Sequence, residues 1–217
     1  MAMRGLFITF EGSEGSGKST QIRRLAERLG ACGREVISLR EPGGTPIGEK
    51  IRHLLQYDGE GHAMTPEAEL LLFAASRAQL VREVIRPALE RGAVVLCDRY
   101  LDSTTVYQGV ARALTPGDVA GINAFATGGT LPDLTLVLDL DAAEGRRRAG
   151  ERKGPADRME QEGDAFYEAV RRGYLDLARA DPKRFAVIDA SVGPDQVEEA
   201  VIGVIKGRLK EDFHGIH

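Results

Sequence analysis

Residues 12–19 read Gly12-Ser13-Glu14-Gly15-Ser16-Gly17-Lys18-Ser19 and match the pattern G-x-x-x-x-G-K-[ST] in full. An apolar run at 6–10 precedes the motif and a helical pattern follows it, which is the strand–loop–helix context that this pattern requires. Glycines let the backbone curl so that several N–H groups converge on one anion, and the helix start adds partial positive charge. We therefore expect these residues and Thr20 to hold the phosphates of ATP, the alternative being a glycine-rich turn without a ligand.

Strand and helix patterns alternate along the rest of the chain. This alternation predicts βαβ units and a parallel sheet with helices on both faces, that is, a three-layer α/β/α fold of the P-loop NTPase type. Residues 1–217 are expected to form one domain. The further strands are expected at 35–39, 93–97, 134–140 and 184–188, and the helices at 19–29, 47–55, 66–90 (with a kink or an end near Pro87), 116–126, 142–152, 160–180 and 194–210.

Composition excludes several classes of protein. The 217 residues carry 33 acidic and 29 basic side chains, and this net charge of −4 argues against a general nucleic-acid binder. Cys32 and Cys97 stand far apart, without the spacing of a disulfide framework or a zinc site. The chain has no apolar run of the ~18 to 20 residues that span a bilayer. We expect a cytoplasmic protein with neither nucleic acid nor membrane as a partner.

A second charged site is expected where the strand at 93–97 ends. Ligands of open parallel sheets bind beyond the carboxyl ends of the strands, and Asp98 follows this strand directly. Asp98 and the Ser19 hydroxyl are the expected ligands of Mg²⁺. Arg99 comes next and suits a phosphate as a two-pronged donor. The alternative is a surface pair formed by Asp98 and Arg99.

The segment at about 142–160 is rich in basic residues and in glycine and proline. A basic flap of this kind suits a lid that closes over ATP, excludes water and places positive charge on the transferred group. Arg148 and Arg152 lie one helical turn apart. The alternative is a solvated helix face on which Glu144 pairs with Arg148. The basic residues are Arg146, Arg147, Arg148, Arg152, Lys153 and Arg158.

Several sequence blocks, in order and over nearly the whole chain, resemble the thymidylate kinases, specifically the bacterial type. Many enzymes share the phosphate loop. Two other blocks are more specific for this family: the one with arginine, glutamate, proline and glycines, and the one that reads Tyr-Gln-Gly. The blocks are Phe10-Glu11-Gly12, Arg40-Glu41-Pro42-Gly43-Gly44-Thr45, Leu72-Phe73-Ala74-Ala75-Ser76-Arg77, Asp98-Arg99-Tyr100, Tyr107-Gln108-Gly109 and Asp157-Arg158.

The resemblance implies a pocket for the acceptor base. Phe73 would stack on thymine and Arg77 would hydrogen-bond its carbonyl edge, with Thr104 and Gln108 beside the base and Tyr107 under the deoxyribose. From pattern alone, Phe73 and Tyr107 are also typical of core residues and Gln108 of a surface residue. For Arg77 the alternative is an ion pair with Glu69 or Glu83. For Thr104 the alternative is Thr105, because a shift of one residue in register would put Thr105 beside the base instead. Thr104 stands where some relatives have serine.

The resemblance also implies roles around the phosphates. Arg99 and Arg52 would hold the acceptor phosphate, while Glu14 would approach the sugar 3′-hydroxyl or the metal. Some relatives have aspartate in place of Glu14. One class of the family carries a basic residue inside the phosphate loop, and this chain does not. That difference places it with the lid-arginine class, in which Arg152 is the best match for the catalytic residue and Arg148 and Lys153 are rivals.

The reaction implied by this resemblance is phosphorylation of dTMP to dTDP with ATP and Mg²⁺, in the synthesis of dTTP. The expected catalytic residues are Lys18, Arg99, Arg148 and Arg152. A kinase for another monophosphate or for a deoxynucleoside, and a nucleotide-binding switch protein without a small acceptor, are the alternatives. The family is usually dimeric, so a homodimer is expected, and residues 70–75 would serve an interface or a core equally well.

Overall fold

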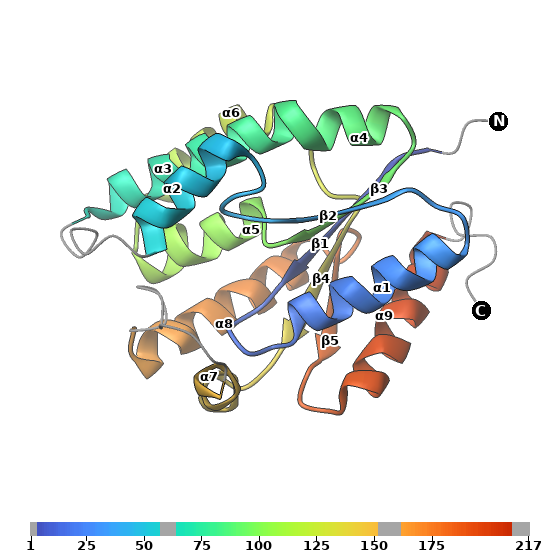
Figure 1. The fold of residues 1–217 in the computed structure, drawn as a ribbon. Coiled ribbons are helices and arrows are strands. Elements are labelled where there is room, and N and C mark those ends of the chain that lie inside the picture. Colours follow the sequence, from blue (N-terminus) through green and yellow to red (C-terminus); the bar gives the residue numbers. More distant parts are fainter. Residues whose placement is uncertain (1–3, 57–63, 152–161, 210–217) are drawn as a thin grey trace.

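A computed structural model describes residues 4–56, 64–151 and 162–209. Five parallel strands form one sheet in the order β2-β3-β1-β4-β5 (Figure 1). This confirms the predicted parallel sheet, with strand limits that differ from the expected ones by at most one residue. The strands are β1 (Leu6–Glu11), β2 (Val36–Arg40), β3 (Val94–Asp98), β4 (Leu134–Asp139) and β5 (Phe185–Asp189).

Helices cover both faces of the sheet (Figure 1). Their bounds are α1 (Lys18–Ala31), α2 (Pro46–Gln56), α3 (Pro66–Leu80), η2 (Val81–Ile85), α4 (Arg86–Glu90), α5 (Leu101–Thr104), η3 (Thr105–Ala111), α6 (Pro116–Thr127), α7 (Ala142–Gly150), α8 (Asp164–Ala180) and α9 (Pro194–Arg208). None of the helices within the described residues is long and apolar enough to cross a bilayer.

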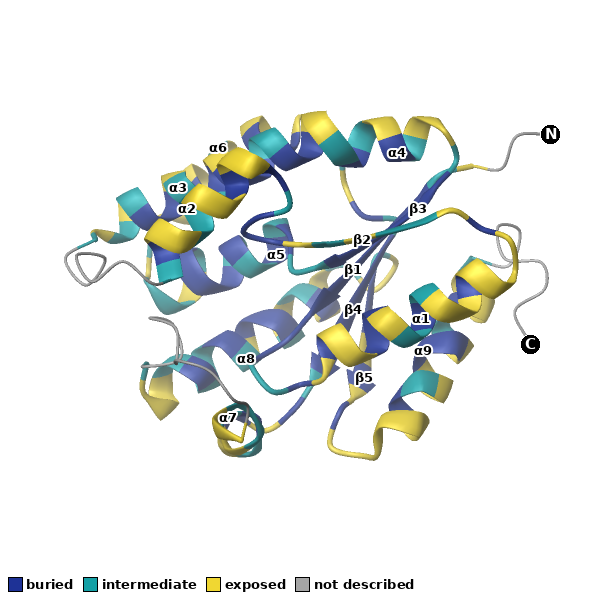
Figure 2. Cartoon of the chain, in the orientation of Figure 1, coloured by how far each residue is buried: buried dark blue, intermediate teal, exposed yellow. Residues whose placement is uncertain are grey.

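The central strands are buried on both faces, as Figure 2 shows. Alternate side chains of β1 point to opposite faces of the sheet. Leu6, Ile8 and Phe10 pack with α1 and α9, while Phe7 packs with η2 and α4 on the other face. A third apolar cluster joins η3, α8 and β4 on that second face. The continuous apolar runs seen in the sequence are explained by this double coverage.

The carboxyl edge of the sheet is charged. Each strand ends in a charged residue, and the loop that follows β1 lies between the ends of β3 and β4, its two neighbours. Chemistry-bearing side chains therefore converge at one edge, as expected for ligands of an open parallel sheet. The five strand-end residues are Glu11, Arg40, Asp98, Asp139 and Asp189.

Two helical segments differ from the prediction. Helix 66–90 does not end near Pro87; it widens to a π-helical turn over Val81–Ile85, where the Arg86 amide donates to the Val81 carbonyl. Pro87 has no N–H to donate within the helix, and a π turn accommodates that missing hydrogen bond. Residues 101–111 form α5 and η3, which the pattern did not predict. Gly109 and the β-branched residues there have low helix propensity, so tertiary packing stabilises this segment.

Candidate active site

The phosphate loop has the curled backbone that its glycines predict. Gly12, Gly15 and Gly17 all have positive φ, at 133°, 73° and 90°. The Lys18 side chain folds back over the loop, where Nζ donates to the carbonyls of Gly12 at 3.1 Å and Ser13 at 2.9 Å. Burial lowers the pKa of Lys18, and the positive charge of Arg99 adds to this effect. The ammonium thus already lies at the loop that is built to receive an anion.

The loop packs directly against α7, backbone to backbone. A Cβ added to Gly15 would lie 2.1 Å from the Gly145 carbonyl oxygen, and one added to Gly145 would lie 2.6 Å from the Glu14 carbonyl oxygen. Neither position has room for a methyl group. The close approach fixes the first turn of the predicted lid segment to the loop.

Gly15→Ala is therefore expected to raise the KM for ATP by about tenfold or more, because a methyl group in a packed contact costs ~1 to 3 kcal/mol. Steady-state kinetics measure the change. Gly33→Ala is the control: Gly33 also has positive φ, but no atom lies within 4 Å of its added Cβ. A KM for ATP that is no higher in the Gly15 variant than in the Gly33 variant would contradict a role of the Gly15–Gly145 contact in ATP binding.

The two predicted metal ligands meet beside the loop. The Ser19 hydroxyl donates to Asp98 Oδ2 at 2.8 Å, across the gap between α1 and β3. The described residues contain no group of three or more His, Cys, Asp or Glu side chains that would hold a metal on its own. One hydroxyl and one carboxylate suit Mg²⁺, which binds oxygen and takes its other ligands from phosphates and water. The donor set therefore fits a MgATP site.

Arg99 links this site to the second binding region. Its Nη2 donates to Glu14 Oε1 at 2.5 Å, and its guanidinium lies over the Tyr107 ring, 5.0 Å from the centroid. Its backbone is left-handed, with a φ of 69°. This conformation costs a side-chain-bearing residue about 1 kcal/mol or more, so the surroundings must hold it in place. Arg99 is thus a constrained, partly exposed cation facing the phosphate loop.

Glu11 lies under Arg99 and is fully buried. Its carboxylate accepts hydrogen bonds from the Tyr100 amide, the Ser103 hydroxyl and the Tyr174 hydroxyl. Burial, and to a smaller extent the charge of Asp102, raise the pKa of Glu11 to about 7. The hydrogen bonds from Ser103 and Tyr174 and the charge of Arg99 act in the opposite direction.

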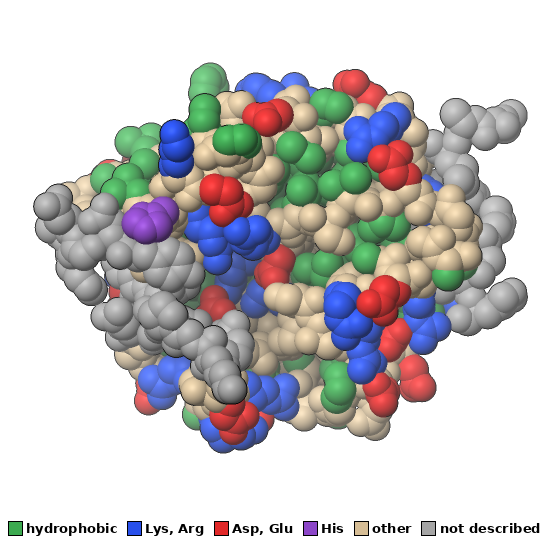
Figure 3. Space-filling view, in the orientation of Figure 1, with side chains coloured by type: hydrophobic (Ala, Val, Ile, Leu, Met, Phe, Trp, Pro, Cys, Tyr) green, Lys and Arg blue, Asp and Glu red, His purple; other side chains and the backbone are tan. Residues whose placement is uncertain are grey.

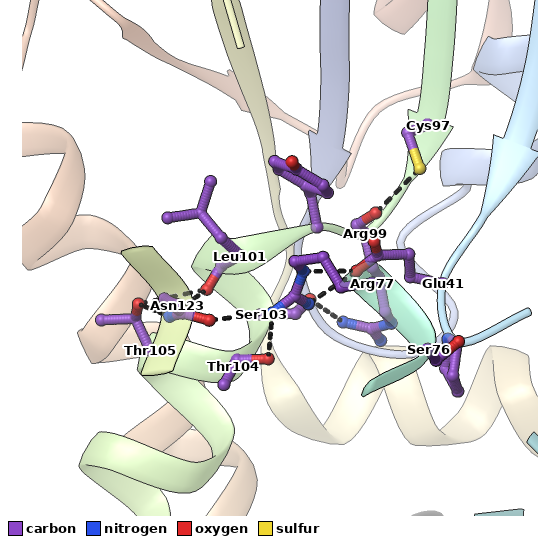
Figure 4. Close-up of polar contacts among 12 residues, drawn as sticks. Glu41, Ser76, Arg77, Cys97, Arg99, Leu101, Ser103, Thr104, Thr105 and Asn123 are labelled. Atoms are coloured by element: carbon purple, nitrogen blue, oxygen red, sulfur yellow. Dashed lines mark hydrogen bonds and ion pairs between the residues drawn. The ribbon is translucent and has the colours of Figure 1, made fainter. Parts of the chain in front are cut away.

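Arg77 lies at the other end of the site, buried on α3 between three elements, as Figure 4 shows. Nε and Nη2 donate to Glu41 Oε2 at 2.8 and 2.6 Å, while Nη1 donates to Thr104 at 3.0 Å and to Asn123 at 2.8 Å. A guanidinium has five N–H donors. Among the described residues four of these donors have acceptors, and one N–H on Nη2 has none.

The two ends of the site share a wall. Thr104, which accepts from Arg77, follows Ser103, which accepts from Arg99. Arg77 and Arg99 are therefore held by consecutive residues of α5, and Arg99 contacts Glu14 of the phosphate loop. Figure 4 shows both arginines directed toward this short helix. Figure 3 shows acidic and basic side chains around a hollow in the middle of the face above α7.

The other predicted base-site residues lie along the same helices. Phe73 is half-buried and belongs to none of the three apolar clusters, so the core expected from pattern alone is wrong for it. Gln108 is buried rather than on the surface and donates to Glu69 Oε1 at 2.7 Å. Thr105 binds the Leu101 carbonyl, which leaves Thr104 as the threonine that contacts Arg77.

The remaining predicted residues are placed as follows. Arg52 donates to the Pro42 carbonyl at 3.1 Å. Arg148 pairs with Glu144, as the helix-face alternative expected, and also donates to the Ala190 carbonyl at 3.0 Å, in the loop after β5. Arg152, with Lys153, Asp157 and Arg158, lies outside the described residues.

Sequence reasoning missed the partners that hold these arginines. It paired Arg77 with Glu69 or Glu83 on the same helix, but the partner is Glu41, in the loop after β2. Arg40, by contrast, pairs with Glu49, which also accepts from the Gly44 amide, so this pair organises the turn. Asn123 on α6 gave no signal, because a single polar residue in a helix is usually solvated.

Comparison with known proteins agrees with this geometry. The family model for thymidylate kinase matches residues 10–201. A thymidylate kinase of Deinococcus radiodurans is 50% identical over 205 residues, covering 94% of this chain and 98% of the relative. One of Syntrophotalea carbinolica is 53% identical over 196 residues, covering 88% and 90% of the two chains.

A solved structure is similar as well. The crystal structure of thymidylate kinase from Ehrlichia chaffeensis superposes with a TM-score of 0.77 at 33% identity, covering 93% of this chain and 99% of that one. Sequence and fold therefore point to the same family. The chain belongs to the thymidylate kinase family, the nucleoside monophosphate kinases that use ATP to phosphorylate dTMP to dTDP for dTTP synthesis.

Proposed function

We propose that this chain transfers the γ-phosphoryl group of ATP in line to a 5′-phosphate oxygen of dTMP, with Arg99 between the two substrates. The observation that carries the proposal is the position of Arg99, bonded to Glu14 of the phosphate loop and to Ser103 of the helix that holds Arg77. A phosphate oxygen is anionic at neutral pH, so no general base is needed. Catalysis then depends on alignment and on neutralising charge.

The loop residues Gly12 to Ser19, with Thr20, are proposed to bind ATP. Loop amides hold the phosphates, and Lys18 exchanges its loop carbonyls for phosphate oxygens. Mg²⁺, held by Ser19 and Asp98, would supply charge at the oxygens it bridges. Glu14 separates the two substrates and is proposed to approach the sugar or the metal.

The dTMP site is proposed to run from Arg99 and Arg52 at the phosphate to Arg77 at the base. Phe73 stacks on thymine, and its incomplete burial leaves surface for this contact. Arg77 offers its remaining Nη2 donor to a carbonyl of the base. Tyr107, with its ring under Arg99, lies where the deoxyribose joins the phosphate. Thr104 and Gln108 complete the base side.

A lid over 142–160 is proposed to supply the last positive charge, from Arg152 or Arg148, within a single kinase domain of residues 1–217. Arg148 donates to the Ala190 carbonyl, in the loop after β5. This hydrogen bond supports a role for Arg148 other than contact with the transferred phosphoryl group. A site near that loop would suit a contact with the nucleoside of ATP. This favours Arg152 as the catalytic arginine.

A panel of acceptors tests the proposed function. ADP release from ATP is measured with dTMP, dUMP, UMP, CMP, AMP and GMP and without an acceptor. We expect kcat/KM for dTMP to exceed that for the purine monophosphates by about a hundredfold or more, because a hydrogen-bonding pocket rejects ligands that leave its groups unpaired. A preference for another monophosphate, or ADP release independent of the acceptor, would contradict the assignment.

We also propose a cytoplasmic homodimer. Leu71 on α3 and Phe125 on α6 have exposed fractions of 57% and 80%, and these two helices pack against each other. Large apolar side chains in such positions favour burial against a second copy. Cys32 and Cys97 are present as reduced cysteines, which suits a reducing compartment.

A further inference from the structure

Glu11 is buried beneath Arg99, the residue proposed to bind the acceptor phosphate, and is not itself among the residues proposed to contact either nucleotide. It is the last residue of β1, and its side chain is directed to the face where α5 and α8 lie. Oε1 accepts from the Tyr100 amide at 2.8 Å. Oε2 accepts from the Ser103 hydroxyl at 2.6 Å and the Tyr174 hydroxyl at 2.8 Å.

The same two hydroxyls also contact Arg99. Its Nη1 donates to Ser103 Oγ and to Tyr174 Oη, both at 3.3 Å. A hydroxyl has one proton and two lone pairs. When the carboxylate of Glu11 takes both protons, both oxygens present lone pairs to the guanidinium. The two hydroxyl oxygens are also 2.9 Å apart, so either hydroxyl is able to donate to the other. The negative charge on Glu11 favours the arrangement in which both donate to the carboxylate.

Glu11 also fixes the backbone at Arg99. The Arg99 amide donates to the Phe10 carbonyl at 2.9 Å, and the next amide, that of Tyr100, donates to Glu11. These two bonds lie on either side of the left-handed φ of Arg99. They hold a conformation that an arginine rarely adopts. The last two residues of β1 therefore aim Arg99 toward the phosphate loop.

We propose that Glu11 is the positioning residue for the acceptor phosphate, orienting the Arg99 guanidinium through the Ser103 and Tyr174 hydroxyls and through the Tyr100 amide. The proposal rests on the role of Arg99 in binding that phosphate. A carboxylate in this place bears a desolvation cost, which an apolar residue would avoid. In return, the Glu11 carboxylate accepts hydrogen bonds from three donors and places a negative charge beneath Arg99.

Glu11→Gln tests this proposal, assayed above the pKa of about 7 so that the natural residue is ionised. The glutamine amide keeps the size of the side chain but donates to the hydroxyl oxygens, which turns their protons toward Arg99. We expect the KM for dTMP to rise about tenfold and the KM for ATP to stay within about twofold, because hydrogen bonds to a charged group are lost on one substrate only.

Two further variants make the result decisive. Tyr174→Phe removes one of the two hydroxyls and is expected to shift the same KM in the same direction, which keeps the test open if Glu11→Gln does not fold. Thr9→Val is the control, because Thr9 is buried on the same face of β1 and bonds only to Thr135 at 2.9 Å among the described residues. It should leave both KM values unchanged.

The outcomes separate this inference from the proposed function. If Arg99→Met leaves the KM for dTMP unchanged, the role of Arg99 is wrong. If Arg99→Met raises it and the folded Glu11→Gln and Tyr174→Phe variants do not, the Glu11 inference alone is overturned. Equal changes in the KM for dTMP and the KM for ATP in the Glu11→Gln variant would also overturn the Glu11 inference. Combined with Arg99→Met, Glu11→Gln should add no further rise in the KM for dTMP.

Discussion

Lys18→Ala is expected to lower kcat by about a thousandfold, because it removes a preorganised positive charge from the migrating phosphoryl group. Lys18 Nζ already lies at the carbonyls of its own loop, so little reorganisation is needed when the phosphates arrive. The melting temperature should change little, since Lys18 makes no ion pair among the described residues and its contacts are local. Single-turnover kinetics with saturating ATP and dTMP measure the loss.

Arg23→Ala is the matched control for charge. Arg23 lies on the same helix, is well exposed and pairs with Glu27 at 2.8 Å. Exposed pairs of this kind contribute little to stability, so activity and melting temperature should match those of the natural chain. Turnover of the Lys18 variant near that of the Arg23 variant would refute the role of the loop lysine.

Arg77→Met is expected to lower kcat/KM for dTMP by about a hundredfold, because the buried donor proposed to bind the base is lost. The substitution also leaves Glu41 buried without a positive partner, which costs ~3 to 5 kcal/mol of folding free energy. The single variant therefore mixes a loss of binding with a loss of stability. Thermal unfolding and steady-state kinetics are both needed.

The double variant Arg77→Met with Glu41→Gln separates the two effects. Both charges of the buried pair are then absent, so much of the lost stability should return, as for buried ion pairs replaced by neutral groups. The defect in dTMP use should persist, with the KM for ATP unchanged. Recovery of dTMP affinity together with stability would mean that Arg77 serves only the fold.

Most of the sheet could be predicted from the sequence, because the sequence patterns that indicate strands are local. The β1 run, the glycines of the loop and Lys18 lie within a few residues of one another, and each restricts the backbone directly. The order of helices and strands followed from patterns of the same short range. The start of the helix at Pro66 is also fixed locally, because the hydroxyl of Thr65, the residue before it, accepts from the Ala68 amide.

The site was harder to predict, because its contacts join residues that are far apart in the sequence. Phe73 and Arg77 are four residues apart on α3, but the acid that holds Arg77 is 36 residues away, in the loop after β2. Spacing within a helix reveals only neighbours three or four residues apart. The helix over 101–111 was missed because its stability comes from α6 and α8, and this helix carries Ser103 and Thr104.

The contact between Gly15 and Gly145 has a consequence for local opening. Because no atom separates the two backbones, the loop cannot uncurl without displacing the first turn of α7. Segments joined in this way open as one cooperative unit in amide hydrogen exchange. Nucleotide binding should therefore slow exchange both in the loop and in the first turn of α7.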